Sequence, residues 1–273
     1  QNRWVNVGTG GGTTIITSTD GLTWTPALSG AFNSSGSKVI YAGGKWVAVG
    51  NGGGAILSSI DGLNWTGGSG TFTNQGSDVA YDGAGRWVAV GYNINQMSYS
   101  DNGTSWTLCS GTTFTFAGLA VAYGGGRWVA VGSGGNTIIT STDGITWTGA
   151  LGTTFSNEGF AVVYDGVARW VAVGSDSGGP NTILTSTDGL NWFPVTGTTF
   201  SSGGYGIAFG NGRFVATGYD PVNTILTSLD GLNFETVLGK QFSPLSLRNP
   251  VYGGGVWVAV GSASVNNTSI LYS

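Results

Sequence analysis

The sequence predicts an all-β fold made from one four-stranded unit repeated along the chain. A Trp-Val-Ala-Val-Gly string or a near copy recurs about every 42 residues, between short runs rich in Val, Ile, Thr and Tyr. Gly fills 52 of the 273 positions, and no stretch of helical length shows a 3.6-residue periodicity. A period of this size, built from strands and turns, is typical of propeller blades. We therefore expect a single β-propeller domain over residues 1–273. The string begins at Trp4, Trp46, Trp87, Trp128, Trp170, Phe214 and Trp257.

Each unit divides into four predicted strands, A to D. Strand A ends in a Val-x-Tyr type segment such as Val79 to Tyr81, and strand B is the recurring string. Strand C is a Thr-Ile-Ile-Thr-Ser type segment such as Thr137 to Ser141, and strand D follows an Asp-Gly turn. Gly-rich links between strands A and B supply the positive φ angles that tight reversals need.

The count of strands bears on the number of blades. Strands B and C occur seven times, whereas strands A and D occur six times. We expect seven blades, the first without strand A and the last without strand D; six blades with a spare B–C hairpin is the alternative. Either arrangement leaves a sheet edge that a partner chain, a second copy or residues outside the given sequence could cover.

Composition limits the possible functions. Charged residues make up 8% of the chain and the net charge is −4, so no basic stripe suits a nucleic acid. No apolar run approaches 18 residues, which predicts no membrane span. Cys109 is the only cysteine and His is absent, which excludes an internal disulfide, a Ser-His-Asp triad and a His-ligated zinc site. We expect no metal, no cofactor and a secreted location, with which an N-terminal Gln is compatible.

A Ser-x-Asp-Gly-x-x-Trp motif links strands C and D. It resembles the Asp-box of sialidase-type propellers, and the longer pattern from Trp-x-Ala-Val-Gly to Ser-Thr-Asp-Gly-x-x-Trp resembles the photosystem II assembly-factor family of propellers. The resemblance covers nearly the whole chain, at the level of the repeat unit. One copy, which starts at Ser98, is interpreted as carrying an insertion. The motif acids are Asp20, Asp61, Asp101, Asp143, Asp188 and Asp230.

These acids are expected to serve the turns, by accepting backbone hydrogen bonds, and not to catalyse a reaction. Sialidase chemistry, as the resemblance implies it, would need an arginine cluster and a Tyr-Glu nucleophile pair. The only Glu residues, Glu158 and Glu235, lie in different units, and the Arg residues share one repeat position before strand B. A calcium role and a glycosidase pair that uses Asp176 or Asp220 remain alternatives. The cations at the shared position are Arg3, Lys45, Arg86, Arg127, Arg169 and Arg213, with Val256 in the last unit.

The B–C loops and the D–A crossovers share one end of each unit and vary in sequence. Binding chemistry concentrates in loops that a rigid scaffold holds, although unconstrained drift would also produce variation. A Phe that recurs in the crossovers is expected to plug the core; it is Phe32, Phe72, Phe114, Phe155, Phe200 and Phe242. The predicted ligand-binding residues are Tyr92, Asn93, Asn95, Asp176, Asn181, Tyr219, Asp220 and Asn223.

The sequence thus predicts a non-catalytic, extracellular binding module, lectin-like or adhesive, with a glycan or a surface protein as its partner. Two alternatives stay open: a structural or assembly subunit that docks through an unpaired blade edge, and a glycosidase.

Overall fold

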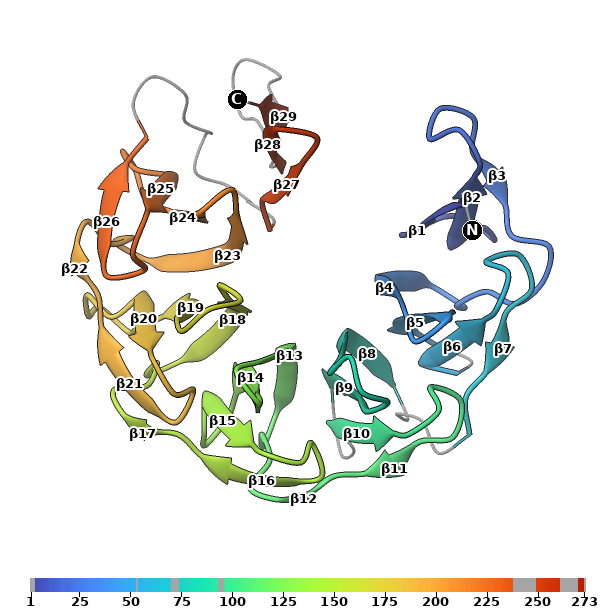
Figure 1. Ribbon diagram of the computed structural model, residues 1–273, viewed down its shortest axis with the longest axis horizontal. Coiled ribbons are helices and arrows are strands. Elements are labelled where there is room, and N and C mark those ends of the chain that lie inside the picture. The colour runs from blue at the N-terminus through green and yellow to red at the C-terminus, as the bar shows by residue number, and fades with distance from the viewer. Residues whose placement is uncertain are drawn as a thin grey trace. The chain divides into compact units, whose positions relative to one another are not determined.

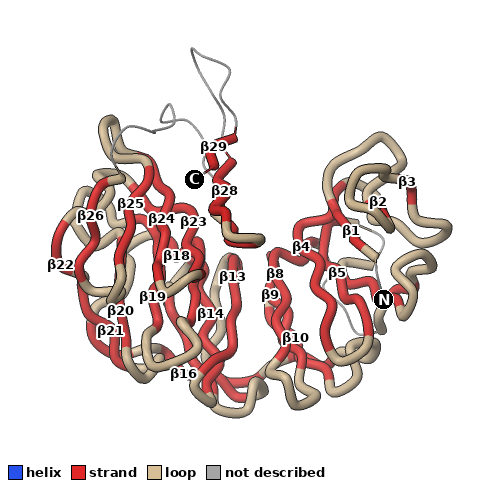
Figure 2. Tube along the Cα trace, turned by 45° about the horizontal axis from the view of Figure 1, so that its top comes forward, coloured by secondary structure: helices blue, strands red, loops and turns tan. Residues whose placement is uncertain are grey.

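The computed structural model describes residues 3–52, 54–69, 74–92, 96–237, 249–260 and 270–272. This part of the chain consists of strands and loops, without a helix (Figure 2), so no described segment could cross a membrane as a helix. The all-β prediction is confirmed. The chain divides into two compact units: unit 1 holds residues 1–123 and 141–148, and unit 2 holds residues 124–140 and 149–273.

Unit 1 contains the first three copies of the repeat and part of the fourth (Figure 1). The first sheet lacks a strand A and runs B–C–D, whereas the second and third sheets are complete. Consecutive strands pair in antiparallel fashion. The strands are β1 (Trp4–Val7), β2 (Ile15–Ser18), β3 (Thr25–Pro26), β4 (Ser35–Ala42), β5 (Lys45–Asn51), β6 (Ile56–Ser59), β7 (Thr66–Gly67), β8 (Gln75–Tyr81), β9 (Trp87–Tyr92), β10 (Met97–Ser100), β11 (Thr107–Leu108), β12 (Ser110–Gly111), β13 (Ala117–Gly124) and β16 (Thr146–Gly149).

Unit 2 contains the B and C strands of the fourth copy, two complete sheets and a last sheet of three strands (Figure 1). Its strands are β14 (Arg127–Ser133), β15 (Ile138–Ser141), β17 (Leu151–Gly152), β18 (Glu158–Tyr164), β19 (Trp170–Ser175), β20 (Ile183–Ser186), β21 (Asn191–Pro194), β22 (Thr196–Gly197), β23 (Gly203–Gly210), β24 (Arg213–Tyr219), β25 (Ile225–Ser228), β26 (Asn233–Thr236), β27 (Val251–Gly253), β28 (Val256–Val260) and β29 (Ile270–Tyr272). Across the described residues, strand B and strand C each occur seven times, as predicted from the sequence; a ring of seven blades stays a prediction.

The register of each sheet centres on the aromatic that begins strand B. In the third sheet Trp87 lies opposite Tyr81 of strand A and opposite Ser100 of strand C. The rings of Tyr81 and Trp87 are 4.6 Å apart between centroids. The recurrence of Tyr or Phe in strand A and of Trp or Phe in strand B therefore places an aromatic pair at the same height in successive sheets.

Neighbouring sheets pack through alternate residues of strand B. Val47 and Val49 of β5 form one buried cluster with Trp87 and Ala89 of β9, in the next sheet. Because side chains alternate along a strand, the two Val residues of the string face the following sheet, whereas Trp and Ala face the preceding one. This packing explains why the string is apolar on both faces.

The crossover Phe side chains are buried, as predicted, for Phe32, Phe114, Phe155 and Phe200; Phe72 and Phe242 lie outside the described residues. A Thr directly before strand C fixes the crossovers of Phe32, Phe155 and Phe200. In unit 2 the Thr182 hydroxyl donates to the carbonyl of Phe200 and accepts from its N–H, both at 3.0 Å. These Phe residues belong to the core and are not a ligand platform.

A connection between sheets that the sequence did not indicate involves the segment after strand D. This segment runs parallel to strand D of the next sheet, as β17 does beside β21 and β22 beside β26. The approach is so close that a Cβ on Gly152, whose φ is +82°, would lie 2.4 Å from the carbonyl oxygen of Trp192. Only Gly fits at this position without displacing the backbone.

Candidate functional site

The turn between strands C and D is built around a Ser and an Asp; we call it the C–D turn. In the second sheet, Asp61 Oδ1 accepts the backbone N–H groups of Leu63 and Asn64, both at 2.8 Å. The Ser59 hydroxyl donates to Asp61 at 2.9 Å and accepts the N–H of Gly62 at 2.9 Å. The same pattern recurs at Asp20, Asp143, Asp188 and Asp230. Each turn thus satisfies its own donors with a local acid.

The third sheet corrects one prediction. The acid of its C–D turn was assigned to Asp101, but Asn102 occupies the position, with Ser100 as the partner hydroxyl. Asn102 Oδ1 accepts the N–H groups of Thr104 and Ser105, both at 2.9 Å, and Ser100 accepts the N–H of Gly103 at 2.8 Å. The copy therefore has the regular spacing Ser-x-Asn-Gly-x-x-Trp and no insertion, because the Ser, the Gly and the Trp fix the frame, not the Asp.

These hydrogen bonds favour the ionised form of the turn acids. Backbone N–H groups, with that of Asn64 first, hold the pKa of Asp61 well below its usual range. Burial raises the pKa of Asp188, but the N–H and side-chain amide of Asn191 outweigh it and lower this pKa to about 2. An acid that stays ionised, with its oxygens taken by the backbone, is poorly suited to exchange protons with a substrate near neutral pH.

The cation before strand B packs over the C–D turn of the following sheet. A Cβ placed on Gly62 would lie 2.7 Å from Arg3 Cδ and 3.1 Å from Val5 Cγ2. The stem of Lys45 covers Gly103 in the same way, and those of Arg127 and Arg169 cover Gly189 and Gly231. These cations form a packing contact that repeats from sheet to sheet, and they do not gather into a carboxylate-binding cluster.

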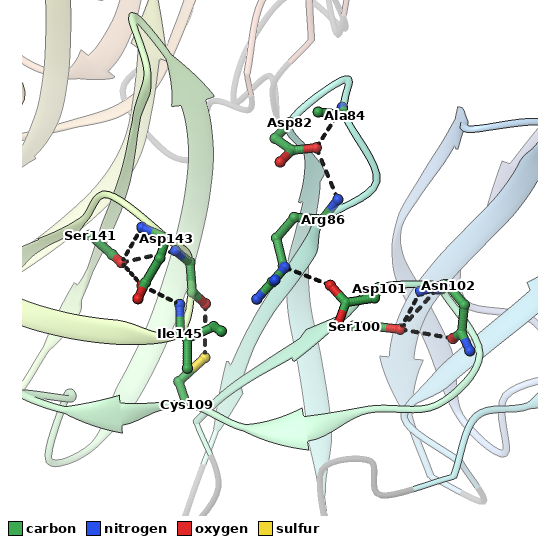
Figure 3. Close-up of polar contacts among 12 residues, drawn as sticks. Asp82, Ala84, Arg86, Ser100, Asp101, Asn102, Cys109, Ser141, Asp143 and Ile145 are labelled. Carbon is green, nitrogen blue, oxygen red and sulfur yellow. Dashed lines mark hydrogen bonds and ion pairs between the residues drawn. The ribbon is translucent and has the colours of Figure 1, made fainter.

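Arg86 is an exception in this series (Figure 3). Its Nε lies 2.8 Å from Asp101 Oδ1 in its own sheet, and its guanidinium lies 4.9 Å from the centre of the Tyr99 ring.

Cys109 donates from its thiol to the carbonyl of Gly144 at 3.5 Å, and burial raises its pKa to about 12. The thiol is therefore neutral at ordinary pH and lacks the thiolate that nucleophilic attack requires.

The end of the sheets with the B–C loops and D–A crossovers, here called the loop end, holds two predicted ligand-binding acids. Asp176 accepts the Ser156 hydroxyl at 2.5 Å and the N–H of Asn181 at 3.1 Å. Asp220 accepts the N–H of Ser201 at 3.0 Å and that of Asn223 at 2.8 Å. Both acids join a B–C loop to the crossover beside it. We therefore assign them to the scaffold of the loops.

The remaining predicted residues are not brought together by these contacts. Asn181 uses its N–H on Asp176, and Asn223 accepts the Thr236 hydroxyl at 2.9 Å. Tyr219 is partly exposed in unit 2. Tyr92, in unit 1, meets the exposed Phe116 edge-on, with ring centroids 6.4 Å apart. Asn93 and Asn95 lie outside the described residues.

Two aromatic residues at the loop end of unit 2 were missed. Phe160 of β18 and Tyr205 of β23 have ring centroids 4.9 Å apart, and 38% of Tyr205 is exposed. Each occupies the bulge near the start of strand A, where the pairing skips from Gly159 to Ala161 and from Gly204 to Gly206. A bulge redirects a side chain. The sequence signal was a large aromatic directly after the Gly of strand A, where the second and third units carry Ser.

The corresponding stretch of unit 1 is polar. Lys38 of β4 lies 3.9 Å from Asp78 of β8, and Asp78 also accepts the N–H of Val121 in β13 at 3.1 Å. Burial raises the pKa of Asp78, and the charge of Lys38 opposes the rise. These contacts tie three neighbouring A strands of unit 1 together.

The Asp carboxylates of the chain are engaged in contacts, which makes them poorly suited to acid–base chemistry. Each of the 11 Asp residues accepts a backbone hydrogen bond or forms an ion pair. Five lie in C–D turns, Asp82 and Asp165 lie in A–B turns, Asp176 and Asp220 lie at the loop end, Asp78 lies between A strands, and Asp101 pairs with Arg86. Among the described residues, no three His, Cys, Asp or Glu side chains cluster as a metal would require.

Comparison with known proteins shows the fold. No family model matches the chain, and no curated protein matches it. Among solved structures, YCF48 from Cyanidioschyzon merolae has a TM-score of 0.66 and 21% identity, over 99% of this chain and 90% of that one. YCF48 bound to D1 peptide has a TM-score of 0.65 and 15% identity, over 99% and 87%.

Two further structures extend the likeness. The computationally designed Ika8 protein has a TM-score of 0.67 and 14% identity, over 98% of this chain and 82% of that one. The GH74 enzyme of Niastella koreensis has a TM-score of 0.60 and 17% identity, but this chain spans only 39% of that one. Identities this low establish architecture alone. With the repeated four-stranded sheets, these likenesses show that the chain is a β-propeller repeat protein.

Proposed function

We propose that this protein is a non-catalytic binding module that holds a polypeptide ligand at its loop end. The observation that carries the proposal is the contrast between acids and aromatics there. Asp176 and Asp220 are bonded inward, whereas Phe160, Tyr205 and Tyr219 present ring surface. Rigid, partly exposed aromatics supply contact area at low entropic cost, which suits recognition better than acid–base chemistry.

A polypeptide ligand accords with the similarity to YCF48, one of whose structures holds a D1 peptide. It also accords with the low charge of the chain, which favours neither nucleic acid nor a strongly charged ligand. Tyr rings hydrogen-bond through their hydroxyls and stack through their faces, so they can hold the side chains and the backbone of a peptide at once.

The test begins with peptides selected by phage display on the wild-type protein. We expect their dissociation constants to rise at least tenfold, about 1.4 kcal/mol, in Phe160→Ser and Tyr205→Ser. Phe193→Ser is the matched control, because Phe193 is an exposed aromatic of strand D in the same unit, and it should leave binding unchanged. Equal affinity in all four proteins would place the ligand elsewhere.

A glycan is the second candidate ligand, and the same aromatic pair favours it, since sugar rings stack on Tyr and Phe faces. In that case the protein would be an extracellular, lectin-like module. A glycan array probed with the wild type and with Tyr205→Ser distinguishes the two. Glycan signals that disappear in the variant support this candidate. An array without signal, together with retained peptide binding, removes it.

Catalysis is not part of the proposal. We expect no turnover of chromogenic glycosides, because each Asp is already engaged and the two Glu residues lie in different sheets. Hydrolysis that Asp176→Asn or Asp220→Asn abolishes, with the fold retained, would contradict the proposal.

A further inference from the structure

Glu158 differs from the Asp residues of the chain, because its carboxylate has no partner among the described residues of unit 2. It is the first residue of β18, at the loop end, and its side chain is partly exposed. Both strands that pair with it at this point, β14 and β19, belong to the same unit. No described group of unit 2 donates a hydrogen bond to the carboxylate or forms an ion pair with it. The carboxylate is therefore an acceptor that unit 2 leaves without a donor.

Two serine hydroxyls flank Glu158. Ser133, the last residue of β14, and Ser175, the last residue of β19, lie directly opposite Glu158 on its two sides. Directly opposite side chains stand on the same face of a sheet. Both hydroxyl oxygens are buried without a hydrogen-bond partner, and Ser133 is only 5% exposed. Because buried polar groups in proteins are nearly always bonded, these three side chains, here called the Glu158 row, lack donors that a ligand can bring.

The aromatic pair of the proposed peptide site lies next to this row. Phe160 follows Glu158 by two residues, about 7 Å along a strand, and its ring centroid lies 4.9 Å from that of Tyr205. Gly203 lies opposite Ser175 on β23, so the row has no side chain at its next position. A Cβ there would lie 3.4 Å from the Cβ of Ser175. Ring faces next to a carboxylate suit a long cationic side chain, since its stem packs on the rings while its head reaches the acid.

The charged groups around the Glu158 row are of one sign. Each described cation of unit 2 stands at the start of a strand B, at the opposite end of its sheet, about 20 Å away along the strand. At physiological salt the influence of an exposed charge falls off within about 8 Å, so these cations do not neutralise the row. The cations are Arg127, Arg169 and Arg213, and the carboxylates of the described loop end are Glu158, Asp176 and Asp220.

Unit 1 shows which partner an acid near the start of strand A takes. There Asp78 of β8 has the ammonium group of Lys38 as its cation, at 3.9 Å. At the position of Lys38, directly after the bulge, β18 carries Ala161 and β23 carries Gly206. The described sheets of unit 2 thus supply a carboxylate near this end but no cation, which leaves the cation to a ligand.

We propose that the Glu158 row binds the cationic side chain of a Lys or Arg in the polypeptide ligand, whose stem packs on Phe160 and Tyr205. This assignment rests on the proposed function: the cationic residue belongs to an otherwise neutral peptide held at the loop end. Hydrogen bonds from an ammonium or guanidinium group to a carboxylate are stronger than neutral ones. Both groups carry several N–H donors, enough for Glu158 and for a hydroxyl of the row.

The experiment uses the full chain and the peptides that phage display selects on it. Peptides whose affinity falls in Tyr205→Ser are resynthesised with norleucine, an uncharged side chain, in place of each Lys or Arg. Isothermal titration calorimetry compares each pair of peptides on the wild type, Glu158→Gln and Glu235→Gln. Glu235→Gln is the matched control, because Glu235 is an exposed Glu of strand D in the same unit and its replacement removes the same charge.

We expect norleucine at one position to raise the dissociation constant at least tenfold in the wild type and in Glu235→Gln. In Glu158→Gln the same replacement should change it by less than about twofold, because the carboxylate that distinguishes the two peptides is gone. Peptides that carry Lys and Arg in turn at this position distinguish the two cationic heads, and a tenfold advantage of either over norleucine supports the proposal. Should Glu158→Gln unfold, the ¹³C resonance of the Glu158 carboxyl in the wild type takes its place: the cationic peptide should shift it, whereas the norleucine peptide should not.

Two results would overturn the proposal and leave the proposed function intact. One is a set of selected peptides that need Tyr205 but contain no Lys or Arg. The other is a norleucine penalty that is as large in Glu158→Gln as in the wild type.

Peptides that bind the wild type and Tyr205→Ser equally would instead contradict the proposed function. In that case acetyl-lysine methylamide and acetyl-norleucine methylamide are titrated against the ¹³C resonance of the Glu158 carboxyl. A shift with the lysine probe alone supports the cation site, and no shift with either probe overturns it.

Discussion

The C–D turns of the second and third sheets are a natural substitution experiment within one protein. The second sheet uses Asp61 and the third uses Asn102, yet both side-chain oxygens accept two backbone N–H groups at 2.8–2.9 Å. An amide oxygen is uncharged, so the turn needs an acceptor and not a carboxylate. In the third sheet the carboxylate stands one residue earlier, at Asp101, and pairs with Arg86. The difference indicates that the repeated acids serve the turns.

The largest loss of stability is expected where the segment after strand D runs beside strand D of the next sheet, as β12 does beside β16. In unit 1, a Cβ on Gly111, whose φ is +85°, would lie 2.3 Å from the carbonyl oxygen of Trp147. We expect Gly111→Ala to lower the free energy of unfolding by about 3 kcal/mol, through strain and steric overlap. Urea unfolding measures the loss. Gly67→Ala, with nothing within 4 Å of its Cβ, should cost less than half as much, and an equal cost would refute the assignment.

Exchanging the two acceptors sharpens the comparison. Asp61→Ala leaves the N–H groups of Leu63 and Asn64 without their acceptor and should lower the free energy of unfolding by about 1–3 kcal/mol. Asp61→Asn reproduces the third sheet and should recover most of that cost. Asn102→Ala should cost as much as Asp61→Ala. Chemical denaturation of the three variants checks these values; if Asp61→Asn were as damaging as Asp61→Ala, the charge would matter after all.

Low pH should weaken the C–D turns that carry Asp and not the turn that carries Asn102. The turn lowers the pKa of Asp188 to about 2, so the stability it contributes is present above the ordinary pKa near 4 and is lost as the pH falls towards 2. The double variant Asp61→Asn, Asp188→Asn should therefore be less stable than the wild type at pH 7, and this gap should narrow by pH 2. Thermal melts over this range measure the gap; a gap that widens in acid contradicts the account.

The smallest effect is expected at the displaced acid. Asp101 is 70% exposed in its ion pair with Arg86, and exposed pairs contribute little. Asp101→Ala should change the free energy of unfolding by less than about 1 kcal/mol, as thermal unfolding would show. A loss as large as that of Asp61→Ala would mean that Asp101, and not Asn102, holds the turn.

The repeat pattern was sufficient to predict the four strands of a unit and the buried Phe residues of the described crossovers, because these depend on period and polarity alone. The frame of the third turn was missed because the residue type was followed in place of the Ser-to-Gly spacing. The roles of Asp176 and Asp220 depend on contacts with Ser156 and Ser201, about 20 residues away, which no local pattern encodes. The pair Phe160–Tyr205 depends on a bulge in each strand A. Blade number, secretion and a single domain stay predictions.

The most direct test of the central claim is a ¹³C NMR titration of the aspartate carboxyl groups. If the C–D turn acids serve the scaffold, Asp20, Asp61, Asp143, Asp188 and Asp230 titrate independently, each below the usual range, with Asp188 near 2. A turn acid with a raised pKa, or two of them titrating as a coupled pair as catalytic carboxyls do, would contradict the account.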